Sequence, residues 1–530
     1  MDVSVETQRR RTFGIVSHPD AGKTTLTEKF LLFGGAIQVA GAIKAKKATR
    51  HATSDFMEIE KQRGISVATS VMGFEYNNKK ITILDTPGHK DFCEDTYRTL
   101  TAVDSVIMVI DATKGVEEQT KKLLEVCRMR NTPIMTFVNK MDRETMSPID
   151  IMDNIESHLG MAVCPLSWPI GSGKTFKGVY NRYSNELVLY QPHASAKDAP
   201  TIVMRDVSDP QLITYIGADA ADQLRADLDL LAVYPAFDHA AYRDGTVTPV
   251  FFGSALNNFG VRELLHAFID MAPEPCARQT SMGSLGPSHP AFTGFVFKIH
   301  ANIDPKHRDR IAFLRVCSGQ FERHKKYFHV RSQKSIRSVN PTAFMAQSKT
   351  VIDVAYPGDI IGLHDTGQLK IGDTITEGEA FHFLGIPAFS PELFKVVKNL
   401  DPMKAKQLKK GVQQLMEEGV AQLFHRYIDG QMIIGTVGAL QFDVIQYRLE
   451  HEYQALCRFE PLSHTKATWI TAEDDTVLDA FIRRRKNQVA TDNNGRYVFL
   501  TDTPWSLERE IAEQTDIQFQ FTADVAHSID

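Results

Sequence analysis

The ten residues SHPDAGKTTL, at positions 17–26, follow the apolar run Phe13–Val16 and lead into a stretch with helical spacing of apolar residues. A strand, a glycine-containing turn and a helix together direct backbone N–H groups at an anion. Lys23 would neutralise the β- and γ-phosphates of a nucleotide, and the Thr24 hydroxyl would ligate Mg²⁺. Ser17 stands where glycine is usual. The predicted phosphate-binding residues are Ser17, His18, Pro19, Asp20, Ala21, Gly22, Lys23 and Thr24.

Short apolar runs alternate with amphipathic stretches over the first 275 residues or so. This alternation predicts a parallel sheet covered by helices on both faces. The runs after the first strand lie at 80–84, 105–110, 133–138 and 248–252. Ligands of such sheets bind beyond the carboxyl ends of the strands, so the residues that follow each run are candidates for the site.

Two further motifs follow such runs. The first is Asp85-Thr86-Pro87-Gly88-His89. The Asp85 carboxylate would hold Mg²⁺ through water, and Gly88 would bring its N–H to the γ-phosphate. The second is Asn139-Lys140-Met141-Asp142.

The second motif favours guanine. The Asp142 carboxylate can accept hydrogen bonds from both N1–H and the exocyclic amine of guanine, whereas adenine would leave it unpaired. Asn139 would bridge to the phosphate loop, and the Lys140 stem would lie along the base. Ser254-Ala255-Leu256, which follow the apolar run at 248–252, would close the pocket around the base. We therefore predict a GTP-binding loop, despite the serine at position 17.

The bulk composition is that of a globular protein of several domains. The chain has 530 residues, of which 43% are hydrophobic and 24% charged. No apolar run is long enough to cross a membrane, and the first residues lack the apolar stretch of a secretory signal. Unpaired cysteines at 93, 127, 164, 276, 317 and 457 argue against disulfides and zinc. We expect a cytoplasmic monomer with no membrane or DNA partner.

Net charge is −5, yet basic residues gather in several places that would suit a large polyanion. These residues are Lys44, Lys46, Lys47 and Arg50, then the segment 306–334, and then Arg483, Arg484, Arg485 and Lys486.

The fold prediction is a multi-domain α/β protein. Residues 1–278 would form the P-loop domain, with an insertion at about 147–245, because one helix and one strand between Asp142 and Ser254 need only about 30 residues. A second GSGKT, at 171–175, precedes a strand-like stretch, so we interpret it as a turn. Residues 290–380 would form an antiparallel β-barrel, and residues 381–530 a ferredoxin-like α+β domain in which the tail continues the same domain.

The motifs HPDAGKTT, EKQRGIS, DTPGH, NKMD, EDTYRTL and TGFVFKI together resemble the translational GTPases, and among them the bacterial class-II peptide-chain release factors. The resemblance implies GTP and GDP as ligands, with Mg²⁺, and slow hydrolysis until the ribosome completes the site. It implies that His89 orients the attacking water and that Ser66 supplies the switch hydroxyl for Mg²⁺, with Thr69 as the alternative. It also implies that Asp20 helps to hold a cation. Basic residues of the second domain, among them Lys306, Arg308, Arg310 and Arg315, would face RNA phosphate.

Three functions fit these expectations. The first is a termination GTPase that ejects class-I release factors from the ribosome. The second is a translocase or ribosomal-protection GTPase, which would need further domains, and we expect the residues after 460 to be too few to build them. The third is a regulatory GTP-binding switch that acts only through partner affinity.

Overall fold

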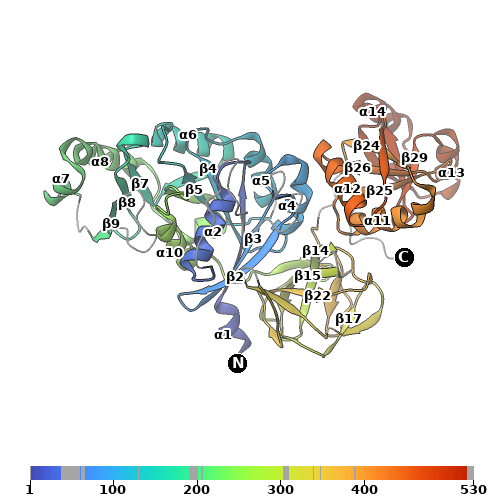
Figure 1. The fold of residues 1–530 in the computed structure, drawn as a ribbon, viewed down its shortest axis with the longest axis horizontal. Coiled ribbons are helices and arrows are strands. Elements are labelled where there is room, and N and C mark those ends of the chain that lie inside the picture. Colours follow the sequence, from blue (N-terminus) through green and yellow to red (C-terminus); the bar gives the residue numbers. More distant parts are fainter. Residues whose placement is uncertain are drawn as a thin grey trace.

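The computed structural model describes residues 2–37, 60, 66–128, 130–189, 201–203, 207–301, 310–337, 339–345, 348–386 and 390–521. They form an N-terminal α/β domain with an inserted subdomain, a β-rich second domain and an α+β C-terminal domain (Figure 1). The α/β architecture predicted from the sequence is confirmed. Among these residues, none of the helices has the length and apolar character that crossing a bilayer requires.

The N-terminal domain is built on a sheet of order β2-β3-β1-β4-β5-β11-β6, in which β2 alone runs antiparallel to its neighbour β3. Buried β-branched and aromatic side chains fill these strands, as expected of a sheet covered on both faces. The strands are β1 (Arg10–Ser17), β2 (Ser70–Tyr76), β3 (Lys79–Asp85), β4 (Ser105–Asp111), β5 (Ile134–Asn139), β6 (Ala162–Pro165) and β11 (Val247–Phe252).

Helices cover both faces because alternate side chains of each strand point to opposite sides. Ile107 and Val109 of β4 join the hydrophobic cluster that contains α2 (Lys23–Phe33) and α10 (Val261–Met271). Val106, Met108 and Ile110 join the cluster on the other face. The helices of that second face are α4 (Cys93–Leu100), α5 (Glu118–Arg128) and α6 (Pro148–Leu159). Two shorter helices, α1 (Val3–Gln8) and α9 (His239–Arg243), flank the domain.

The inserted subdomain has its own antiparallel sheet, and its helices lie at the end of the molecule away from the C-terminal domain (Figure 1). The Trp168 indole donates to Asp227 at 2.9 Å and so joins this sheet to α8. The subdomain comprises β7 (Ser167–Ile170), β8 (Gly178–Asn181), β9 (Glu186–Leu189), β10 (Thr201–Val203), α7 (Gln211–Ile216), α8 (Ala218–Leu230) and the 3-10 turn η3 (Leu231–Val233).

Two predictions concern this subdomain. The pairing of Ala162 with Val247 places β6 in the central sheet, so the part with a separate sheet begins at Ser167 rather than at about 147. The second GSGKT contains the 3-10 turn η2 (Gly173–Thr175) between β7 and β8, where no helix follows the lysine. The interpretation of this segment as a turn is confirmed.

The second domain is an open antiparallel β arrangement around its own core, as predicted for a β domain. A single parallel bridge between Met345 and Gly73 joins its sheet to β2. Its strands are β14 (Thr293–Ala301), β15 (Arg310–Ser318), β16 (Phe321–Glu322), β17 (Lys326–His329), β18 (Lys334–Arg337), β19 (Thr342–Met345), β20 (Ser348–Val351), β21 (Val354–Ala355), β22 (Ile360–His364) and β23 (Thr374–Thr376), preceded by the hairpin β12 (Arg278–Thr280) and β13 (Gly283–Leu285).

The basic residues of this domain correct one expectation. Arg310 and Arg315 do not face solvent, because both are buried in ion pairs, Arg310 with Asp365 and Glu417 and Arg315 with Asp104. The pair of Arg310 with Glu417 joins the second domain to the C-terminal domain, and the pair of Arg315 with Asp104 joins it to the N-terminal domain. Lys306 and Arg308, like the basic residues at 44–50, lie outside the described residues.

The C-terminal domain repeats one topology twice in a continuous sheet of order β27-β24-β26-β25-β29-β30-β28-β31. The first unit is the predicted βαββαβ arrangement: β24 (Leu393–Asn399), α11 (Ala405–Glu417), β25 (Gln422–Arg426), β26 (Met432–Thr436), α12 (Ala439–His451) and β27 (Cys457–Pro461). The second has the same order: β28 (Lys466–Ala472), α13 (Asp475–Arg484), β29 (Val489–Asp492), β30 (Tyr497–Thr501), α14 (Pro504–Glu513) and β31 (Ile517–Gln520). The sequence-based expectation missed this second unit and treated it as a tail.

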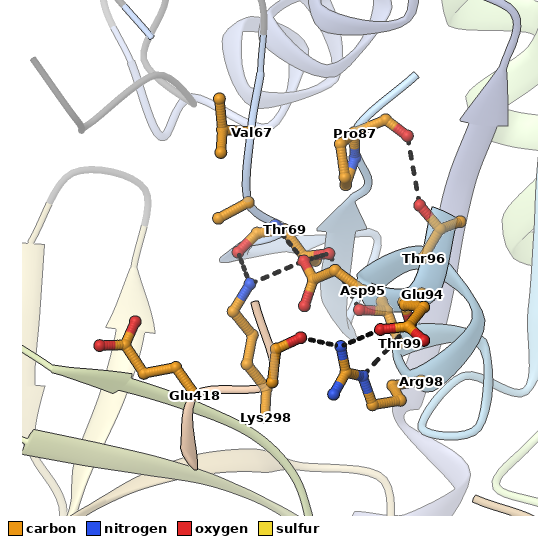
Figure 2. Close-up of polar contacts among 12 residues, drawn as sticks. Val67, Thr69, Pro87, Glu94, Asp95, Thr96, Arg98, Thr99, Lys298 and Glu418 are labelled. Atoms are coloured by element: carbon orange, nitrogen blue, oxygen red, sulfur yellow. Dashed lines mark hydrogen bonds and ion pairs between the residues drawn. The ribbon is translucent and has the colours of Figure 1, made fainter. Parts of the chain in front are cut away.

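Helix α4 lies where the three domains meet (Figure 2). The Lys298 ammonium of β14 donates to Asp95 at 2.9 Å and to the Thr69 carbonyl at 3.0 Å. The Arg98 guanidinium donates to the Gly419 carbonyl of the C-terminal domain. The N-terminal domain is therefore tied to both other domains through one short helix.

Candidate nucleotide-binding site

A cavity of about 380 Å³ opens at the carboxyl ends of the parallel strands. Three separated motifs of the sequence meet there, as their positions after strands predicted. The lining residues are Ser17, His18, Pro19, Asp20, Gly22, Lys23, Thr24, Thr25, Ser66, Gly88, His89, Asn139, Lys140, Asp142, Arg143, Ser254 and Leu256.

The phosphate loop connects β1 to the first residue of α2, Lys23. Gly22 has φ +99°, and a Cβ there would lie 2.2 Å from Asn139 Nδ2, so conformation and space both require glycine. Asp20 also has a positive φ, of 64°. The Ser17 hydroxyl donates to the His18 carbonyl at 2.8 Å, and the serine is thereby accommodated where glycine is usual.

Lys23 and Asp85 form a buried ion pair, with Nζ 2.5 Å from Oδ1. The second carboxylate oxygen of Asp85, Oδ2, is buried and has no hydrogen-bond partner among the described residues. A buried carboxylate oxygen without a partner is the kind of ligand that Mg²⁺ prefers, and Thr24, which lines the cavity, offers a hydroxyl. The residues present therefore fit a magnesium ion.

Ser66 and Thr69 were alternatives for the switch hydroxyl. Ser66 lines the cavity. Thr69 is buried elsewhere, where its hydroxyl and amide both donate to Asp95 at 2.7 Å. The geometry favours Ser66. Gly64 and Ile65, which precede it in the predicted switch, lie outside the described residues.

His89 stands at the edge of the cavity, with 30% of its side chain exposed. It follows Gly88, at which a Cβ would lie 3.4 Å from the Pro19 backbone, so this turn approaches the phosphate loop closely. The Thr96 hydroxyl of α4 donates to the Pro87 carbonyl at 3.2 Å (Figure 2). The turn that carries His89 is thus held between the phosphate loop and α4.

Asn139 organises the other end of the cavity. Its Nδ2 donates to the Ala21 carbonyl at 2.8 Å, which is the predicted bridge to the phosphate loop. Its Oδ1 accepts from the Lys140 and Ala255 amides at 2.9 and 2.8 Å. The Ser254 hydroxyl donates to Asp142 at 2.6 Å. The loops at 17–24, 139–142 and 254–256 therefore form one hydrogen-bonded wall.

Lys140 lies along this wall in a left-handed conformation, with φ 74°, and its ammonium is 2.5 Å from Asp111 Oδ2. Burial alone would raise the pKa of Asp111, but hydrogen bonds from Lys140 and Thr113 outweigh it and lower that pKa. Asp111 is therefore charged at neutral pH and fixes the Lys140 stem.

Some predicted residues support the wall without lining the cavity. Met141 is fully buried in the hydrophobic core, so its side chain does not face the nucleotide. The Ala255 amide donates to Asn139. Ala21, Asp85, Thr86 and Pro87 likewise stand outside the lining set. Thr25 and Arg143 line the cavity although neither is among the predicted site residues. Thr25 is the last residue of the HPDAGKTT motif, and Arg143 directly follows NKMD.

The fold and this cavity define a P-loop nucleotide-binding protein. Residues 8–274 match the family described as the elongation factor Tu GTP binding domain, and the chain belongs to this family. It is a translational GTPase, an enzyme that hydrolyses GTP. Residues 291–378 match elongation factor G domain 2, and residues 383–510 match the class II release factor RF3 C-terminal domain.

Among solved structures, the chain is similar to a crystal structure of a protein from Thermus thermophilus. The TM-score is 0.69 at 20% sequence identity, and the match covers 88% of this chain and 71% of the other. At this level of identity the likeness shows the fold alone.

Proposed function

We propose that this translational GTPase acts in termination, where it promotes the departure of class-I release factors from the ribosome after the peptide is released. The observation that supports this role is the match of residues 383–510 to a class II release factor C-terminal domain, in one chain with the GTPase domain. A role on translating ribosomes places the protein in the cytoplasm as part of the same proposal.

In this proposal the phosphate loop holds the β- and γ-phosphates, with Lys23 released from Asp85 to contact them. The Asp142 carboxylate selects guanine, because only a base with two adjacent hydrogen-bond donors can donate to both carboxylate oxygens. Thr24, Ser66 and Asp85 are the residues that would hold Mg²⁺. The ion neutralises charge on the phosphates when it is bound.

His89 orients the water that attacks the γ-phosphate. Phosphoryl transfer depends on placed charge and a positioned nucleophile more than on covalent help from the protein. Because His89 lies on a partly exposed turn, a partner surface can fix its position. Hydrolysis is accordingly slow in the free protein and faster on the ribosome.

Loss of the γ-phosphate releases the segments that contact it, and partner affinity changes with them. The turn at His89 continues into α4, which contacts both other domains. Loss of the γ-phosphate therefore changes contacts that α4 makes with the second and C-terminal domains.

The test of this function uses post-termination ribosomes that carry a labelled class-I release factor. Adding the protein with GTP is expected to shorten the residence time of that factor, and GDP is expected to be ineffective. Stimulated hydrolysis without faster departure would instead favour a translocase-like or protection role. A hydrolysis rate that ribosomes do not change would favour the regulatory switch.

A further inference from the structure

Asp91 lies between His89 and the C-terminal domain. It belongs to the 3-10 turn η1 (Lys90–Phe92) and is 4% exposed. Its Oδ1 is 3.3 Å from His89 Nδ1, and its Oδ2 accepts from the Leu440 amide at 2.7 Å. One buried carboxylate thus joins a residue of the nucleotide cavity to a helix of another domain.

The helix in question is α12, and Leu440 is its second residue. The first amides of a helix lack partners inside the helix, and the helix dipole favours a negative charge beside them. Asp91 therefore caps α12 from a different domain.

The residue before α12 is a glycine, and Asp91 explains why. A Cβ on Gly438 would lie 2.0 Å from Asp91 Cγ. The Gly438 backbone is extended, with φ −141° and ψ 161°, so its conformation would accept any residue. The need for glycine here comes from the carboxylate and not from the backbone.

Apolar contacts fix the two elements against each other. Val67, Phe92 and Val444 form a small buried cluster, with Leu440 and Tyr447 packed at its edge. The same junction carries the contacts of α4 with Lys298 and with the Gly419 carbonyl (Figure 2). Asp91 is thus held in place by the docked C-terminal domain.

Asp91 also contacts the imidazole of His89 in two ways. Its backbone N–H donates to Nδ1 at 3.2 Å when that nitrogen carries no proton. Its carboxylate is the acceptor when Nδ1 is protonated. Both contacts use Nδ1, so Nε2 is the ring nitrogen available to meet the attacking water.

We propose that Asp91 is a positioning residue for His89 in GTP hydrolysis, and that α12 keeps Asp91 in place, so that docking of the C-terminal domain completes the hydrolytic site. This inference rests on the proposed role of His89. It makes the orientation of the histidine depend on a contact with a residue about 350 positions further along the chain.

The first test is kinetic and uses the full chain with ribosomes. Gly438→Ala displaces the Asp91 carboxylate without touching the cavity, and Asp91→Asn removes its charge while an acceptor for Leu440 remains. Each is expected to lower the stimulated kcat about 10- to 100-fold, as expected for a misplaced catalytic group, with KM for GTP unchanged. The double variant is expected to be no slower than the slower single variant. Gly286→Ala, where a Cβ meets no atom closer than 3.8 Å, is the matched control.

A Gly438→Ala protein with wild-type kcat would overturn the inference. A double variant whose fall in kcat equals the product of the two single falls would also overturn it. A loss confined to KM would do the same, because a positioning residue acts on the chemical step.

The second test does not depend on hydrolysis. The ¹⁵N signals of the His89 ring are recorded in histidine-labelled protein and assigned with His89→Gln. Asp91→Asn is expected to move the Nδ1 signal toward the range of an unprotonated nitrogen, and Gly438→Ala to shift the same signal. Unchanged signals in both variants would refute the positioning role even if His89 is required. A different result would be shifted His89 signals in Asp91→Asn and Gly438→Ala together with wild-type turnover in His89→Ala. That result would refute the role of His89 in hydrolysis, although it would confirm the contact between Asp91 and His89.

Discussion

Asn139 shows how much of the site depends on a single side chain. Its amide joins the phosphate loop to the loops at 140 and 255 through three hydrogen bonds of 2.8–2.9 Å. Because Asn139 is buried, any partner left unsatisfied would cost free energy without compensation from water. Asn139 is therefore a structural residue that holds the three loops of the cavity wall together.

In the proposed site Asp142 selects the base; its carboxylate lies in the cavity and accepts a hydrogen bond from Ser254. In Asp142→Asn the side-chain NH₂ group would replace one carboxylate oxygen, so one of the two N–H donors of guanine would face another donor. We expect GTP affinity to fall about 10- to 100-fold, equivalent to about 1.5–3 kcal/mol for hydrogen bonds to a charged group, with ATP affinity unchanged. Competition binding measures this. Asp219→Asn, on the exposed first turn of α8, is the control. An unaltered preference for guanine would remove Asp142 from the base pocket.

In the proposed function His89 orients the water that attacks the γ-phosphate. In His89→Ala the phosphate loop and the base wall stay intact, so affinity for GTP is expected to equal that of the wild type. Ribosome-stimulated turnover is expected to fall by at least about 100-fold, since a positioned proton-transfer group contributes on that order. Single-turnover hydrolysis with saturating ribosomes is the measurement. Wild-type turnover in this variant would exclude His89 from the mechanism.

At the scale of elements, the sequence predicted what depends on local pattern. Runs of β-branched residues and the motifs at their ends located β1, β3, β4, β5 and β11, and hence most of the cavity. The βαββαβ order from β24 to β27 was equally visible. These features repeat every two or every three to four residues and leave a signal in a single sequence.

Contacts between elements left no such signal. Arg315 is a strand residue with the charge of an RNA contact, but it is buried against Asp104 because β15 packs on the N-terminal domain. Asp91 and Gly438 are far apart in the chain, and neither is unusual by itself. The second βαββαβ unit was not predicted because two of its strands, β29 and β31, span only four residues each and leave a short periodic signal.

Helix α4 provides a pH-dependent test. Burial would raise the pKa of Asp95, but the charges of Lys298 and Arg98 outweigh it and lower that pKa to about 2. A carboxyl group whose pKa is depressed in the folded state stabilises the protein above its unfolded pKa of about 3.9, and that contribution fades as pH falls toward 2. Asp95→Asn is therefore expected to cost about 2 kcal/mol of unfolding free energy between pH 5 and 8.

Urea unfolding of the wild type and Asp95→Asn at several pH values measures this difference. It is expected to be constant above about pH 5 and to shrink below about pH 4. A difference that grows on acidification would contradict the assignment of the ion pair.

At the scale of the whole molecule, the three domains converge on the segment that follows the γ-phosphate site. Lys298 of the second domain contacts Thr69 and Asp95, while α12 and Gly419 of the C-terminal domain contact Asp91 and Arg98. We therefore propose that η1 and α4 link the nucleotide state to the arrangement of the domains. A ligand that binds one arrangement better shifts the population toward it by its difference in affinity.

We propose that the loops at 17–24, 85–89, 139–142 and 254–256 form one site for guanine nucleotides with magnesium. Isothermal titration calorimetry of the full chain with GTP analogue, GDP and ATP analogue, with and without Mg²⁺, tests it most directly. We expect binding of both guanine nucleotides, tighter binding of the triphosphate when Mg²⁺ is present, and at least 100-fold weaker binding of the adenine nucleotide, about 2.7 kcal/mol. Equal affinity for the adenine and guanine triphosphates, or no binding of either guanine nucleotide, would contradict it.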